Sequence, residues 1–197
     1  MHACRPPLVV AMGFALMLPA LASAAPDAGA KARGEFNFYG HSAHTKFSSA
    51  RGHVETYQRY LNETHGIAIP TSRQAATVAI ATPEAPTAEN GGVAPEIARE
   101  ASDAIADDIE NIQRHVTSMQ ARAKSLGDEE ATARLATVDK QLGTARRAHA
   151  ALHEHHAGES IAPATAMELA NQVNESLRAA HAEYDKVLRR YGGSSSD

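Results

Sequence analysis

Apolar residues recur at alternating intervals of three and four in four separate stretches of this chain. Between residues 128 and 157 the repeating positions are Leu135, Val138, Leu142, Ala145, His149, Leu152 and His156. This spacing places the side chains on one face of an α-helix. Because an apolar helix face has to be buried against another element, the pattern predicts an all-α domain built from packed helices.

The four predicted helices cover residues 44–65, 94–126, 128–157 and 163–191. The links at 127–128 and 158–162 are short, and short links make successive helices pack as antiparallel neighbours. Gly127 suits the end of the second helix, and Asp128 suits the cap of the third. We therefore expect an antiparallel four-helix bundle whose domain spans residues 43–191.

Three other segments are predicted to lie outside the helices. Residues 25–42 are interpreted as a flexible leader whose aromatic group, Phe36, Phe38 and Tyr39, covers an open end of the bundle. Residues 67–93 are predicted to form a long connector between the first two helices because they are rich in proline and contain a Gly-Gly pair at 91–92. Residues 192–197 are predicted to be a disordered tail.

Residues 1–24 have the pattern of a cleaved signal peptide. Arg5 precedes an apolar run that begins at Leu8, and small residues at 22–24 suit a cleavage site. Pro19 interrupts the run and no basic flank follows it, so we expect no stable membrane insertion after cleavage. The predicted location is therefore periplasmic or secreted.

Composition excludes several classes of chemistry. Cys4 is the only cysteine of the chain and lies in the segment predicted to be removed. The mature protein would then have no disulfide, thiolate metal site, cysteine nucleophile or covalently attached haem. The formal net charge is -4 and no basic stripe is present, so we predict no nucleic-acid partner.

A histidine cluster at the end of the third predicted helix indicates a metal site. His149, His153 and His156 follow at intervals of four and three, which brings their side chains to one helix face about 5–6 Å apart. Imidazole suits copper, zinc and nickel in the divalent state. The alternative is that these histidines are favoured as cations by the helix C-terminus and bind no metal; His155, which points elsewhere, fits that interpretation.

Other histidines are candidates for the same chemistry because of their levels in the predicted bundle. Antiparallel pairing places Glu100, Asp103 and Asp107 beside the cluster, and His65 joins this end if the first helix runs antiparallel to the second. The same pairing predicts a middle layer of His53, His115 and His181. His41 and His44 have H-x-x-H spacing, for which a local turn is the stronger interpretation.

No enzyme signature is present, and we predict that the protein is not an enzyme. No histidine has a glutamate three residues before it, as a di-iron bundle requires. The string "HEHHA" lacks the second histidine of H-E-x-x-H, and no G-x-S-x-G or phosphate-binding loop occurs. Non-covalent haem between His181 and Met119 is a further alternative.

The string "VTSMQ" at residues 116–120 resembles the L-T-x-x-Q motif of small helical periplasmic chaperones and stress sensors, with valine in place of leucine. That resemblance implies an alternative function as a metal-independent chaperone, adaptor or envelope-stress protein with another periplasmic protein as its partner. The histidine pattern favours an exported protein that binds divalent copper, zinc or nickel for buffering, delivery or sensing. The predicted ligands are His149, His153, His156, His65, His115, His181 and His53.

Overall fold

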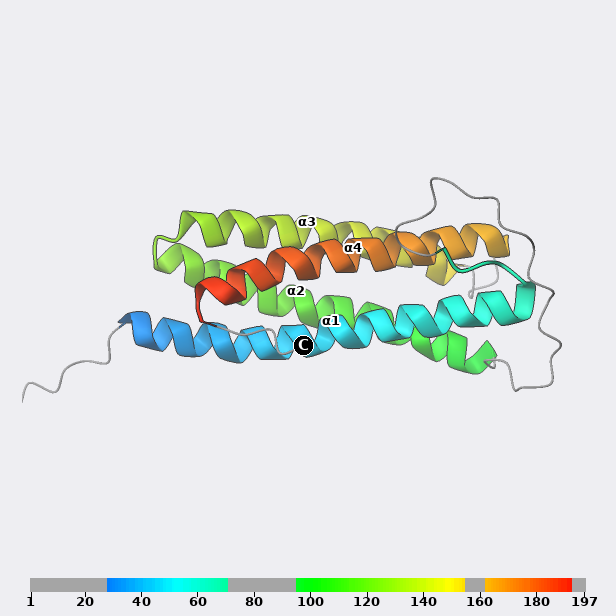
Figure 1. Ribbon diagram of the computed structural model, residues 1–197, viewed down its shortest axis with the longest axis horizontal. Helices are drawn as coiled ribbons and strands as arrows, with labels where there is room; N and C mark the ends of the chain where they lie inside the picture. The colour runs from blue at the N-terminus through cyan, green and yellow to red at the C-terminus, as the bar shows by residue number, and fades with distance from the viewer. Residues whose placement is uncertain (1–27, 71–94, 155–161, 193–197) are drawn as a thin grey trace, which may run out of the picture.

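A computed structural model describes residues 28–70, 95–154 and 162–192 of the chain. In these ranges it contains four α-helices and no strands: α1 (Ala28–His65), α2 (Pro95–Ser125), α3 (Glu129–Glu154) and α4 (Pro163–Arg190). The helices lie alongside one another on the long axis of the molecule (Figure 1). The prediction of an all-helical fold with four helices is confirmed.

Each helix packs against two of the other three. α1 and α3 both contact α2 and α4, so the four helices surround one central core. Near one end of the molecule, Glu35 of α1 pairs with Arg122 of α2, and Phe36 stacks on Tyr191, which follows α4. The start of α1 therefore lies beside the ends of α2 and α4.

The core contains the residues with three-four spacing. In α3 the side chains of the predicted stripe are buried from Leu135 to Leu152. The largest fully buried side chains come from α1 and α4 as well as from α2 and α3: Tyr57, Tyr184, Phe36, Phe47, Leu61, Ile105, Ile109, Ile112, Met119, Leu135, Leu142 and Leu152. Burial of these apolar helix faces is the main source of stability in a fold of packed helices.

The predicted flexible leader is wrong for residues 28–42, which belong to α1. Ala32, Phe36 and Ala43 extend the buried stripe of this helix toward its N-terminus. The rings of Phe36 and Tyr191 stack with centroids 3.8 Å apart, and this contact between distant residues supports the first turns. Of the predicted aromatic group, Phe38 is 69% exposed, so it does not cover the core.

Several other sequence predictions concern residues outside the described ranges. The signal peptide at 1–24, most of the connector at 67–93 and the tail beyond residue 192 lie outside them. Ile97 and Leu126, which lie at the two ends of α2, are exposed. Within the described ranges no helix is long and apolar enough to cross a membrane.

Asp128 caps α3, as predicted, and also joins this helix to the end of α4. Its Oδ1 accepts a hydrogen bond of 3.0 Å from the backbone N–H of Ala131. Its Oδ2 accepts bonds of 2.7 Å from Arg190 Nε and 2.7 Å from the Tyr191 hydroxyl. Burial alone would raise the pKa of Asp128, but the hydrogen bonds from Arg190, Ala131 and Tyr191 outweigh it and lower that pKa to about 2.

Asp128→Asn is expected to make unfolding less sensitive to acid. Because the folded-state pKa of about 2 is below the ordinary value of 3.8, the carboxylate stabilises the fold above pH 4. That contribution, about 1–2 kcal/mol for a partly exposed group, is lost as the pH falls from 4 to 2. Urea unfolding of both proteins at pH 5 and pH 2 measures it. If the free energy of unfolding fell equally in the two proteins between pH 5 and pH 2, the low pKa of Asp128 would be contradicted.

Gly40 marks a close approach between α1 and α4. A Cβ atom at this position would clash with Leu188 Cδ2, whereas a Cβ at Gly52 of the same helix would meet nothing within 4 Å. Gly52→Ala is therefore expected to stabilise the helix by about 0.5–1 kcal/mol. Gly40→Ala should be less stable than Gly52→Ala, because the Leu188 side chain has to shift to admit the added methyl group. Urea unfolding compares the two variants. If they were equally stable, the close approach of α1 and α4 at Gly40 would be contradicted.

Candidate metal-binding site

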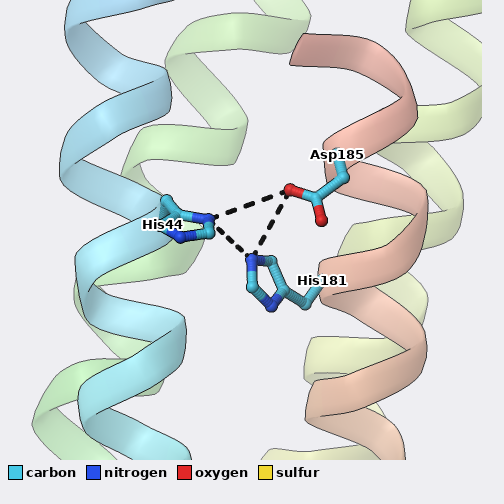
Figure 2. A group of neighbouring side chains, drawn as sticks. All are labelled: His44, His181 and Asp185. Carbon is cyan, nitrogen blue, oxygen red and sulfur yellow. Dashed lines mark hydrogen bonds and ion pairs between the residues drawn. The ribbon is translucent and has the colours of Figure 1, made fainter. Parts of the chain in front are cut away.

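Three side chains that can bind a metal ion meet between α1 and α4. His44 projects from α1, and His181 and Asp185 project from α4 one turn apart (Figure 2). His181 Nε2 lies 2.8 Å from His44 Nδ1 and 3.5 Å from Asp185 Oδ1. The Asp185 oxygen is 3.8 Å from His44 Nδ1, so two nitrogens and one oxygen form a small triangle.

Aromatic residues of the core support this group on its inner side. The ring of Phe47 stacks on His181 with centroids 4.8 Å apart and planes inclined by 12°. Phe47 also packs against Tyr184, whose hydroxyl donates a 3.2 Å hydrogen bond to the Tyr39 carbonyl. These contacts restrict the His181 ring to the orientation in which Nε2 faces α1.

The group is partly buried but not sealed. The side chains of His44, His181 and Asp185 are 27%, 14% and 18% exposed. Burial lowers the pKa of His181; the Asp185 carboxylate opposes this shift, and His44 and Arg51 add to it. His181 is therefore neutral at pH 7 and keeps one nitrogen with a lone pair.

Asp185 Oδ1 is buried and has no hydrogen-bond partner among the described residues. A buried acceptor without a partner costs about 1–3 kcal/mol, and more when it is charged. A cation bound between the three side chains would neutralise this oxygen.

The geometry is close to that of a transition-metal site. With bonds of about 2.0–2.1 Å, the ligand atoms of a tetrahedral ion are about 3.3 Å apart. The observed separations of 2.8, 3.5 and 3.8 Å require only small side-chain movements to reach that value. At 2.8 Å one ring donates an N–H···N hydrogen bond to the other, so metal binding would require that hydrogen to move to the other nitrogen of the donating ring.

The structure gives His181 a different partner from the predicted one. Its neighbour is His44, while His53 and His115 lie elsewhere. Among the described residues, His44, His181 and Asp185 are the group of three potential ligands whose donor atoms all lie within 4.8 Å of one another. The predicted middle layer of His53, His115 and His181 is therefore wrong as a ligand group, because helix rotation turns these histidines toward different neighbours.

His53 belongs to a polar cluster between α1 and α2. Its Nε2 lies 3.3 Å from Ser49 Oγ and 3.7 Å from Asp108 Oδ2, and Lys46 donates a 2.8 Å hydrogen bond to Asp108 Oδ1. A Ser-His-Asp triad uses both ring nitrogens of its histidine. Here both contacts involve Nε2, so the three residues do not form that relay, and the Lys46 ammonium disfavours a second cation.

Two further predicted ligands, His115 and His65, lie away from the group of His44, His181 and Asp185. His115 lies beside the ring of Tyr39, with centroids 6.0 Å apart, and burial lowers its pKa, with Arg114 and Lys46 adding to the shift. His65 is exposed at the end of α1, and its ring lies nearly perpendicular to that of Tyr60. Neither residue joins a group of potential ligands in the described part of the chain.

The predicted cluster in α3 is described in part. His149 is buried, and its Nε2 lies 2.7 Å from the Ser102 carbonyl oxygen and 3.2 Å from Ser102 Oγ. His153 is exposed, with Nδ1 3.6 Å from Asp103 Oδ1, so one of the predicted carboxylates does lie beside it. His156 lies outside the described residues.

The sequence did not place Asp185 and His44 beside His181. His181 and Asp185 are four residues apart on one helix, and this spacing is a visible signal for a shared face. His44 is 137 residues from His181, and nothing local relates the two.

Comparison with protein families, curated proteins and solved structures found no significant match. The protein is therefore classified by its fold and its site alone. In the described residues it is an all-helical protein whose four packed helices bring two imidazoles and one carboxylate together between α1 and α4.

Proposed function

We propose that the protein is exported and binds a divalent transition metal ion, copper, zinc or nickel, for buffering, delivery or sensing. In this proposal residues 1–24 are removed as a signal peptide and the helices form an antiparallel bundle. The observation that supports it best is the convergence of His44 Nδ1, His181 Nε2 and Asp185 Oδ1 from two helices.

The kind of ligand favours this class of ion. Imidazole nitrogen with carboxylate oxygen suits zinc, copper and nickel, whereas calcium and magnesium prefer ligands that are all oxygen. A doubly charged ion would also neutralise the buried oxygen of Asp185, which accepts no hydrogen bond from the described residues. Support for the rings comes from Phe47 stacked on His181, which holds the ligand atom in place before an ion arrives.

The exposure of the site suits reversible binding. Three protein ligands leave a fourth position of a tetrahedral ion for water or for a group of a partner molecule. His44, the most exposed of the three side chains, gives the ion access from solvent. Such a site exchanges its ion, as buffering or delivery requires.

Calorimetric titration of the untagged mature protein with Zn²⁺, Cu²⁺ and Ni²⁺ at pH 7.5 tests the proposal. At least one ion per chain is expected to bind, and His41→Ala serves as the control because His41 is an exposed histidine of the same helix. Absence of binding for all three ions would overturn the proposal. Suppression of client aggregation by the metal-free protein would then support the alternative of a chaperone or adaptor.

A further inference from the structure

A second group of possible ligands surrounds a pocket between α2 and α3, away from the α1–α4 site. The pocket has a volume of about 540 Å³. Its charged and imidazole side chains are Asp103, Asp107, Glu110, Arg146, His149 and His153. Among the described residues, three carboxylates, two histidines and one arginine thus face one solvent-open space.

His149 is held in the tautomer that a metal ligand needs. Its Nε2 is 2.7 Å from the Ser102 carbonyl oxygen, which can only accept, so Nε2 carries the hydrogen. A neutral imidazole has one N–H, and Nδ1 therefore retains its lone pair. Histidines that bind metals commonly donate their other N–H to a backbone carbonyl in this way, which fixes the ring.

The other two candidate ligands, His153 and Asp103, lie close to His149 and can change their side-chain orientation. His153 follows His149 by one turn, and their ring centroids are 6.1 Å apart. The His153 Nδ1 lies 3.6 Å from Asp103 Oδ1, and both side chains are more than half exposed. They are free to rotate toward the pocket, while Asp107 and Glu110 add negative charge to its wall.

We propose that this pocket is a second site for a divalent transition metal ion, held by His149, His153 and Asp103 with water in the remaining positions. The third ligand is a carboxylate of α2, and His156 is not required. Because His153 must rotate before the ion is bound, this site is weaker and exchanges faster than the α1–α4 site. The chain would then hold two ions of different affinity.

Competition between the mature protein and a chromophoric chelator for Zn²⁺ measures both sites. Wild type is expected to bind two ions. His153→Ala combined with Asp103→Asn should weaken the second ion by about tenfold or more and leave the first unchanged. These exposed positions avoid the packing loss that a change at buried His149 would cause, and His65→Ala is a matched control at an exposed histidine.

The double variant His44→Ala/His181→Ala separates this inference from the proposed function. If the pocket binds Zn²⁺, this variant keeps one ion, and adding His153→Ala and Asp103→Asn removes it. Retention of a second ion by the His153→Ala/Asp103→Asn protein at unchanged affinity would overturn the pocket site. A wild-type chain whose single ion disappears with His44 and His181 would also overturn it, while supporting the proposed function.

Discussion

Replacing both His44 and His181 with alanine is expected to weaken binding of the ion at the α1–α4 site by about 100-fold or more, equivalent to about 2.7 kcal/mol. The change removes two of the three converging ligand atoms. Asp185 would remain alone, and a single carboxylate does not compete with water for a transition metal ion at low concentration. Chelator competition with Zn²⁺ measures the change.

Thermal stability provides an independent measurement of the same site. An ion that binds only the folded chain stabilises it by about 2.7 kcal/mol at a concentration 100 times its Kd. Because the ligands belong to α1 and α4, the ion links two helices and the melting temperature should rise with Zn²⁺. His41→Ala should keep this response, and Asp185→Asn, which preserves the shape of the side chain, should reduce it.

Two outcomes would argue against the α1–α4 site. One is a His44→Ala/His181→Ala protein that is folded and binds the same number of ions with the same affinity. The other is a wild-type protein whose melting temperature does not change when calorimetry shows that Zn²⁺ is bound. Circular dichroism of the metal-free proteins establishes that each variant is folded.

Tyr184→Ala is expected to lower the free energy of unfolding by about 3–5 kcal/mol, the usual cost of removing a large aromatic side chain from a core. Tyr184 is fully buried and packs against Phe47 with ring centroids 5.5 Å apart. Its hydroxyl donates to the Tyr39 carbonyl, and lies 3.1 Å from Met119 Sδ. Burial, with a smaller contribution from Asp185, raises the pKa of Tyr184, so the hydroxyl stays protonated as a donor.

Tyr184→Phe is the matched control because it keeps the ring and removes only the hydroxyl. Its expected cost is about 1 kcal/mol, that of one hydrogen bond. Urea unfolding at pH 7 compares the three proteins. An alanine variant no less stable than the phenylalanine variant would show that the ring is not part of the core. Tyr184→Phe should leave metal binding unchanged, since the hydroxyl points away from His181 toward Tyr39 and Met119.

Local spacing predicted the helices well where apolar residues repeat without interruption. The predictions of 94–126 and 163–191 differ by one residue or less at each end from α2 and α4. The start of α1 was missed because Gly34 and Gly40 weaken the helical pattern. That part of the helix is supported by Phe36 stacked on Tyr191, a contact that no local pattern reveals.

The sequence by itself determined which residues are helical, except for the first turns of α1, and which helix faces are apolar, because both follow from spacing within a few turns. It also marked His181 and His149 as possible ligands. Only the tertiary structure decided their partners: His44 and Asp185 for His181, and Ser102 for His149. The physical reason is helix rotation. Successive residues differ by about 100° around the axis, so an uncertainty of one residue is enough to turn a histidine such as His53 toward a different neighbour.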